Sequence, residues 1–363
     1  MDLAAIVHHL YFQKSEPMLY IHQSYCISPQ QTFQNINIEI LNEAIDKKMI
    51  VIEPGYEEIP AGILRRMGKA IRIGVGAAMP IIKNSGPLNG IIIGTANGGM
   101  GDCILFLNQI VQYEEGLLAP GNFVQSTSNA IAGQLGLLSN NKSYNITHVH
   151  RGLAFENAVI DATMHLAASP DHSYLLGGVE EISSYNYNIQ NLTGAYKKED
   201  ISNSKLYETD SPGSIAGEGA AAFLVNNKKE SAVARLEGIR TLHTEDEQLV
   251  KEQLKEFIAQ HLAEGQSIDL FLSGENGDNR SLHFYTACES LLDDDTAIAR
   301  FKHMCGEYPT ASAVGLWYAC RLLQTQDIPH HMFKKRTTKT AYQNILLYNN
   351  FKGGQHSFIL ISK

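Results

Sequence analysis

The sequence is poor in basic residues and lacks any long apolar run. It has 29 Lys and Arg against 38 Asp and Glu, which gives a net charge of −9. Basic surfaces bind phosphate backbones and anionic membranes, so neither nucleic acid nor a membrane is expected as the main partner. No apolar run could span a bilayer, and residues 1–17 lack the cationic start of a signal peptide. We therefore expect a cytoplasmic protein.

Cysteine is also scarce, and its pattern excludes two kinds of site. The five cysteines are odd in number, far apart and without a CxxC pair, so a disulfide framework or structural zinc site is not expected. His148 and His150 form an HxH pair, a pattern that can bind a metal. No third ligand follows at a suitable spacing. We predict no metal and no cofactor.

The remaining composition indicates a large α/β fold. Hydrophobic residues make up 44% and charged residues 18% of 363 residues, enough for a substantial core and one large or two medium domains. Apolar runs that predict strands alternate with helical patterns. Both halves end in two strands with no helix between them, a weak sign of duplication. The strands are expected at 18–28, 90–95, 173–181, 268–274 and within 343–362, and the helices at 61–79, 126–139, 153–168, 245–264, 281–292 and 310–324.

Two further segments have predictions of their own. The runs 219–225 and 231–242 suggest a β-hairpin, and the polar stretch 182–213 suggests a loop. The turn 94-GTANGGMGD-102 follows a strand, but its spacing matches no phosphate-binding loop, so a tight structural turn is favoured. Glu218, in a second glycine-rich segment, could orient a loop or cap a strand.

The stretch 144-YNITHVHRGLAFENAVIDA-162 has an unusual combination of shape and composition. It reads as a short strand, a sharp turn at Gly152 and a helix. Several acyl-transfer enzymes present a nucleophile at such a turn. No Cys or Ser stands there, so the elbow lacks its nucleophile.

These pieces together resemble the β-ketoacyl-ACP synthase branch of the thiolase superfamily, from about residue 18 to the end. Beside the elbow, the similarity is carried by 90-GIIIGTANGG-99, 174-YLLGGVEE-181, 213-GSIAGEGAAAFLV-225, 302-KHMCGEYPTASAVG-315 and 349-NNFKGGQHSFILI-361. The resemblance implies a thiolase-like fold of two duplicated βαβαβαββ halves in five αβαβα layers. The halves would span 18–230 and 231–363, after an N-terminal extension at 1–17.

The resemblance also implies a catalytic set of one cysteine and two histidines, in which the thiolate takes the acyl chain. The matching positions hold Val149, Ser273 and Glu307, so no catalytic residues are expected. The family's lysine is kept as Lys302. By the same similarity, a substrate tunnel or pocket is expected near His148, His150, Arg151, Phe351, Gly353 and Gly354, and Arg151 could pair with Glu307.

A kept scaffold without its chemistry is similar to the chain-length factor of ketosynthase heterodimers. The implied partners are a ketosynthase subunit and an acyl carrier protein that bears an acyl or polyene chain. The implied pathway is of type II polyketide, aryl-polyene or fatty-acid-like type. Two alternatives stay open. One is an active acyl-ACP condensing or acyl-transfer enzyme with non-standard residues, and the other is a scaffold unrelated to polyketides. Whether the chain is an enzyme is therefore undecided from the sequence.

Overall fold

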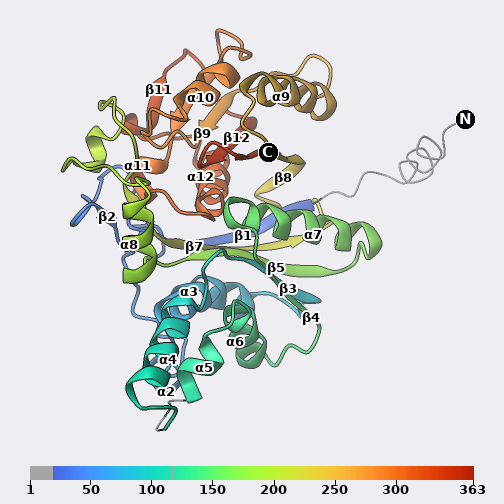
Figure 1. Cartoon of the computed structure of the whole chain (residues 1–363). Helices are drawn as coiled ribbons and strands as arrows, with labels where there is room; N and C mark the ends of the chain where they lie inside the picture. Colours follow the sequence, from blue (N-terminus) through green and yellow to red (C-terminus); the bar gives the residue numbers. More distant parts are fainter. Residues whose placement is uncertain (1–18, 117, 119) are drawn as a thin grey trace, which may run out of the picture.

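The main feature of the fold is one mixed sheet of eleven strands (Figure 1). The computed structural model describes residues 19–116, 118 and 120–363, so the predicted extension 1–17 lies outside the described residues. The strands are β1 Leu19–Ile27, β3 Gly90–Gly94, β4 Tyr144–His148, β5 Ser173–Glu180, β7 Gly219–Asn226, β8 Ala234–His243, β9 Leu270–Ser273, β10 Ala297–Arg300, β11 Phe333–Lys335, β12 Asn344–Phe351 and β13 Gln355–Ser362. A small separate pair joins β2 Lys48–Met49 to β6 Ala216–Gly217.

The strand order repeats, which confirms the predicted thiolase-like architecture. The first half has the order β4-β3-β5-β7-β1 and the second the order β10-β9-β12-β13-β8, with β11 added at the far edge. In each half the first three strands are parallel and the last two pair antiparallel. The halves join through a short antiparallel contact of β1 with β8, from Leu19 opposite Leu236 to Ile21 opposite Ala234. The predicted boundary at 230/231 falls between β7 and β8 and stays a prediction.

Helices cover the sheet in three layers (Figure 1). Helices α3 (Lys69–Asn84) and α6 (Ala130–Ser139) pack on the outer face of the first half, and α9 (Glu247–His261) and α10 (Leu282–Glu289) cover the second. Helices α7 (Ala154–Ala168) and α12 (Ala311–Thr325) lie between the halves. Each helix layer has its own buried apolar cluster, as expected when apolar faces must be covered on both sides of a sheet.

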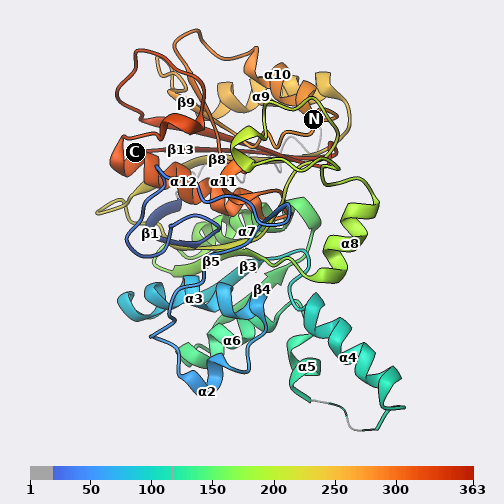
Figure 2. The ribbon, with the colours of Figure 1, turned by 90° about the vertical axis from the view of Figure 1, so that its left-hand side faces the viewer.

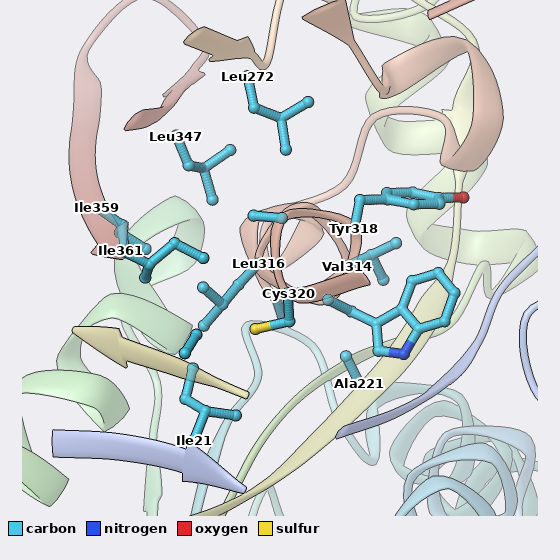
Figure 3. Close-up of a cluster of buried hydrophobic side chains, with 14 of the residues drawn as sticks. Ile21, Ala221, Leu272, Val314, Leu316, Tyr318, Cys320, Leu347, Ile359 and Ile361 are labelled. Atoms are coloured by element: carbon cyan, nitrogen blue, oxygen red, sulfur yellow. The ribbon is translucent and has the colours of Figure 1, made fainter. Parts of the chain in front are cut away.

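Helix α12 is the centre of the largest cluster, as its small residues predicted. Every residue from Ala311 to Cys320 is buried, and a Cβ on Gly315 would lie 2.9 Å from the Phe301 ring. Figure 3 shows side chains of both halves around this helix, with Ile21 and Ala221 on one side and Leu347 on the other. The single tryptophan, Trp317, is only 2% exposed and belongs to this core.

The predicted hairpin of 219–225 with 231–242 is wrong. Strand β1 lies between β7 and β8 in the sheet, pairing with β7 from Tyr20 opposite Asn226 to Ile27 opposite Ala220. Adjacent apolar runs favour a hairpin locally, but here β7 meets a strand about 200 residues earlier in the chain. Only the tertiary pairing decides that competition.

Two other segments differ from the predictions. The expected loop 182–213 contains α8 (Ser184–Leu192), whose first turn is capped by Ser183 Oγ, which accepts from the Asn186 N–H at 3.2 Å. The segment is too polar to show a helical apolar stripe, which is why the pattern missed it. The expected helix 61–79 is two helices, α2 (Ala61–Leu64) and α3, which continues through Pro80 to Asn84.

Candidate active-site cavity

A cavity of about 390 Å³ lies where the two halves of the chain meet at the carboxyl ends of β5 and β12. Crevices at such strand ends are the usual ligand sites of α/β sheets. Helix α8 supplies one wall and the turn between β12 and β13 another. The lining residues are Asn97, Glu180, Glu181, Ile182, Asn186, Tyr187, Gln190, Thr193, Ala195, Tyr196, Gly217, Asn276, Asp278, Arg280, Ser281, Glu307, Tyr308, Pro309, Phe351, Lys352 and Gly353.

Glu307 lines this cavity and forms a buried ion pair with Lys302. Its Oε1 accepts from Lys302 Nζ at 2.9 Å, and its Oε2 accepts from Asn276 Nδ2 at 2.7 Å. Lys302 is fully buried. The predicted pair of Arg151 with Glu307 is wrong, because α11 (Lys302–Cys305) is one short turn that brings residues 302 and 307 together, whereas Arg151 is exposed.

Glu156 places a second carboxyl near the same lysine. It is fully buried in the first turn of α7, and Ser357 Oγ donates to its Oε1 at 2.7 Å. Within the described part of the chain its Oε2 has no hydrogen-bond partner. Burial raises the pKa of this carboxyl above its ordinary value, while the bond from Ser357 and the charge of Lys302 act in the opposite direction. No distinct pattern in the sequence marks Glu156, which looks like one polar residue in an alanine-rich helix.

The glycine-rich turn after β3 is filled by a carboxylate of the protein itself. Glu180, at the end of β5, accepts from Thr95 Oγ1 at 2.8 Å and from the Asn97 N–H at 3.1 Å, and also from the Ala96 N–H. Gly99 has φ of 80°, a conformation that favours glycine. The N–H groups that could hold a phosphate already bind Glu180, in agreement with the structural turn predicted from the spacing.

Glu218 connects loops beneath the cavity. Its Oε1 accepts from the Val51 N–H at 3.0 Å and from Lys69 Nζ at 2.5 Å, and its Oε2 from the Ile182 N–H at 2.8 Å. This is the loop-orienting role considered from the sequence.

Burial, followed by the charge of Asp102, raises the pKa of neighbouring Glu181 to about 7.

The elbow has the expected strand, turn and helix, but its residues 148–151 do not line the cavity. Strand β4 ends at His148, a short 3-10 turn covers Arg151–Leu153, and α7 follows. Val149 is 53% exposed, and the residue with left-handed backbone is Arg151, with φ of 49°. Gly152 is pressed against Phe351, since a Cβ there would lie 2.3 Å from the Phe351 Cβ.

The two elbow histidines lie outside this cavity. His148 Nε2 is 3.0 Å from Asp161 Oδ2, and Asn157 Nδ2 lies 2.9 Å from His150 Nδ1. Both partners belong to α7, so its outer side, at the edge of the sheet, holds the two rings. Of the other residues expected around a pocket, Phe351 and Gly353 line the cavity, whereas Arg151 and Gly354 do not.

Ser273, which was expected to stand at the position of the first family histidine, does not line the cavity. Ser273 is fully buried at the end of β9, where its Oγ accepts from the N–H two residues on, at 3.2 Å. No described residue that lines the cavity is a cysteine or a histidine. Asn276, which the sequence reading did not single out, contributes the amide that binds Glu307; the 273-SGENGD-278 turn was its only signal.

Four of the five cysteines are poor nucleophiles where they stand. Burial raises the pKa values of Cys288, Cys305 and Cys320 to about 12, and that of Cys26 still further, so these thiols stay protonated at neutral pH. Cys103 is part-buried on α4 (Met100–Gln112) and does not line the cavity. Within the described ranges, no group of three His, Cys, Asp or Glu side chains could hold a metal ion, and no helix is both long and apolar enough to cross a membrane.

Strand order, layers and cavity together define an α/β thiolase-like ketosynthase fold with a large mixed sheet. Residues 44–191 match the family model described as "Beta-ketoacyl synthase, N-terminal domain". This part of the chain is therefore similar in sequence to the N-terminal domain of β-ketoacyl synthases. A search of curated proteins gave no significant match.

Solved structures agree with the fold over nearly the whole chain. "The ishigamide ketosynthase/chain length factor" superimposes with a TM-score of 0.76 at 13% identity, covering 96% of this chain and 100% of that chain. A β-ketoacyl synthase from Burkholderia phymatum STM815 gives 0.75 at 12% identity, covering 96% and 99%. A type II PKS acyl-carrier protein in complex with its ketosynthase, AntDE:AntF, gives 0.75 at 13%, covering 96% and 100%. At such low identity these likenesses establish the fold.

Proposed function

We propose that the chain is a catalytically silent, chain-length-factor-like subunit that pairs with an active ketosynthase. The observation that carries the proposal is a ketosynthase-type elbow and cavity without a usable nucleophile. Val149 and Arg151 occupy the elbow, and the four fully buried thiols are held protonated. Acyl transfer through a thioester needs an accessible thiolate, so the fold is kept for a purpose other than that step.

The substituted positions support a structural role. A histidine that stabilises a developing oxyanion must present an N–H to the substrate. Glu307 presents an acceptor instead, and both of its oxygens are bound by Lys302 and Asn276. The network closes on itself inside the protein. It contributes to the packing of α11 and the turn after β9 rather than to a reacting group.

A candidate surface for the partner lies beside β4. This strand is at the end of the sheet order and pairs only with β3 among the described strands. An open edge can accept a strand from another chain. Thr147 Oγ1 of β4 donates to Asn129 Oδ1 at 2.9 Å. In the sequence, Asn129 follows an apolar arm formed by α4 and α5 (Pro120–Gln125). Figure 2 shows this arm extending from the body of the molecule.

The arm has the apolar surface that a stable interface needs. Its exposed large side chains are Met100, Leu105, Leu107, Val111, Tyr113, Phe123 and Val124, with Val111 81% exposed. Monomeric proteins seldom expose so many neighbouring apolar groups. We infer that a ketosynthase subunit covers this arm, and that the acyl carrier protein delivers its chain to that active subunit. The pathway would be of type II polyketide, aryl-polyene or fatty-acid-like type.

The first test is the intact mass of the isolated chain after incubation with an acyl-ACP. No added acyl group is expected. A stable increase of one acyl group would show that a nucleophile exists and would favour the alternative of an active condensing enzyme with non-standard residues.

The second test addresses the partner. The tagged chain, expressed in its source organism, should co-purify with a ketosynthase subunit that has an intact elbow cysteine. Val111→Asp should abolish this association. Leu192→Asp is the matched control, because Leu192 is 87% exposed on α8, outside the arm. Equal association of the two variants would contradict the assignment of the arm.

A further inference from the structure

Two histidines from the second half of the chain hold a loop of the first half through a continuous row of hydrogen bonds. His303 lies in α11 and is 2% exposed, and His331 lies in the 3-10 turn η3 (His330–Met332). His303 Nε2 is 2.9 Å from His331 Nδ1, and His331 Nε2 is 2.8 Å from the Ile38 carbonyl oxygen. At the other end, Tyr207 Oη is 3.2 Å from His303 Nδ1. The histidine row therefore runs from Tyr207 to the loop around Ile38.

The acceptor at one end of the histidine row determines where its protons stand. A carbonyl oxygen can only accept, so His331 Nε2 carries the hydrogen that reaches Ile38. A neutral imidazole has one N–H, so His331 Nδ1 accepts and His303 Nε2 donates to it. His303 Nδ1 then accepts from the Tyr207 hydroxyl, whose pKa is raised by burial. All four groups are satisfied when both rings are neutral and protonated on Nε2.

An added proton has no favourable place in the histidine row. On His331 Nδ1 it would face the N–H of His303, and reversing the His303 tautomer would still leave a charged imidazolium in the interior. Burial, followed by the charges of His331 and Arg300, lowers the pKa of His303 to about 3. Burial also lowers the pKa of His331, although the bond to the loop carbonyl and the charge of Glu39 oppose this shift and His330 adds to it.

The other charged groups around the row already have partners. Arg300 of β10 lies 3.7 Å from the centre of the Tyr207 ring and pairs with Glu275 at 3.0 Å. Lys302, next to His303 in α11, pairs with Glu307. The two carboxylates nearest the buried end of the row are thus engaged by cations, and neither is left to stabilise a charged histidine.

The loop that His331 holds has few other contacts that would keep it closed. Residues 33–44 contain no helix or strand, and Ile38 is the one buried residue among them. The hydrogen bonds at the end of the loop, from Asn42 to Gln30 and from Ala44 to Asn203, join neutral groups. Segments with few buried contacts open at a lower free energy than the whole fold. The bond from His331 to the buried anchor of the loop is therefore its pH-sensitive contact.

We propose that the histidine row is an acid-sensitive clamp on loop 33–44, closed while both rings are neutral and opened when they take up protons. The clamp goes beyond the silent-subunit function and does not depend on it. Its sign follows from linkage, because the closed form keeps the rings neutral whereas released rings titrate near the ordinary histidine pKa of about 6.5. The closed form is fully favoured above that pH and is lost as the pH falls below it. Between pH 7.5 and pH 5.5 the opening constant should rise about tenfold for each ring that is released.

The test is hydrogen exchange of the full chain at pH 7.5 and pH 5.5, read by mass spectrometry and corrected for the pH dependence of the chemical exchange step. Peptides from 33–44 should have a larger opening constant than peptides from α12 at both pH values. Their opening constant should rise about tenfold to hundredfold at pH 5.5. Equal opening constants in the loop and in α12 would mean that only the whole fold opens, and a constant value in the loop would mean that no clamp exists. Either result would overturn the proposal.

His331→Gln removes one titrating ring and keeps an amide that can donate to the Ile38 carbonyl. It should reduce the rise in the loop opening constant about tenfold. His330→Gln is the matched control, because His330 is the preceding residue and is exposed, and it should leave the rise unchanged. An equal rise in both variants would contradict the clamp.

A second measurement needs no variant, in case His331→Gln loosens the loop at both pH values. Nitrogen-15 NMR of the imidazole rings in the unchanged protein at pH 7.5 should show His303 and His331 neutral and protonated on Nε2. A proton on Nδ1 of either ring would overturn the proposed row. Neither measurement contains a ketosynthase or a carrier protein, so failure of the clamp would leave the silent-subunit proposal standing, and the reverse also holds.

Discussion

Replacing Glu307 by glutamine should strongly destabilise the fold although it removes no heavy atom. Glutamine keeps the size of the side chain and an oxygen for the Asn276 amide, but it loses the charge that faces Lys302 at 2.9 Å. Lys302 is 0% exposed, so its ammonium cannot turn to water. A buried charge left without its partner typically costs about 3–5 kcal/mol. We expect a loss of stability in that range at pH 7.

Lys302→Met is the opposite half of the same cycle. This variant leaves Glu307 with the Asn276 amide as a hydrogen-bond donor and with partial access to the cavity, because the Glu307 side chain is 10% exposed. Because this carboxylate keeps one hydrogen-bond donor and some contact with solvent, the variant should lose less free energy of unfolding, about 1–3 kcal/mol. The double variant Lys302→Met, Glu307→Gln buries no charge at this point. Its stability should lie within about 1 kcal/mol of the unchanged protein, far from the sum of the single effects.

Thermal and urea unfolding of the four proteins at pH 7 measure the cycle. Glu156→Gln in the Glu307→Gln background is an added control, because the buried Glu156 is the other carboxyl that interacts with Lys302. If Glu156 partly replaces the lost partner, the combined variant should be less stable than Glu307→Gln alone. Two results would refute the reasoning: a loss under about 0.5 kcal/mol for Glu307→Gln, or additive losses in the double variant.

Three other predictions follow from the same geometry. Glu181→Gln should flatten the pH dependence of stability, because burial and the charge of Asp102 raise the pKa of Glu181 in the folded protein from 4.5 to about 7. The unchanged protein should therefore lose up to about 3 kcal/mol of unfolding free energy between pH 4.5 and pH 7, which would be visible as a falling Tm. An equal fall in the variant would contradict this. Gly152→Ala should lower the free energy of chemical unfolding by about 1–3 kcal/mol, because the added Cβ would overlap Phe351. Gly62→Ala, which has open space around it, should be neutral or stabilising. Similar effects at both sites would disprove the contact. Arg151→Cys should react with iodoacetamide roughly threefold to tenfold faster at pH 7 than Val149→Cys, because position 151 lies near Lys352 in the turn before α7. Faster reaction of Val149→Cys would instead favour position 149 as the place of a nucleophile.

Several elements followed from local pattern alone. The runs 90–95 and 173–181 are apolar enough to be buried strands, and β3 and β5 form within them. Small and apolar residues through 310–324 specify a helix that can pack closely on all sides, and α12 is buried from Ala311 to Cys320. Such segments are predictable because burial on every face requires an apolar residue at every position.

The absence of a cysteine or serine from the turn after β4 was also readable from the sequence. A strand, a sharp turn and a helix without cysteine or serine between them need no coordinates to be recognised. The direction of the side chains did need them. Val149 points to solvent and the histidines bond to α7, since the backbone turns at Arg151 and not at Val149.

The tertiary structure alone decided how distant segments meet. Strand β1 separates β7 from β8, Glu307 binds Lys302 instead of Arg151, and Glu156 from α7 lies near that same lysine. Local sequence determines which segments form strands and helices because propensity and periodicity act over a few residues. The partner of a buried charge or of a sheet edge depends on which surfaces are brought together across hundreds of residues. That choice is made by the packing of the whole chain.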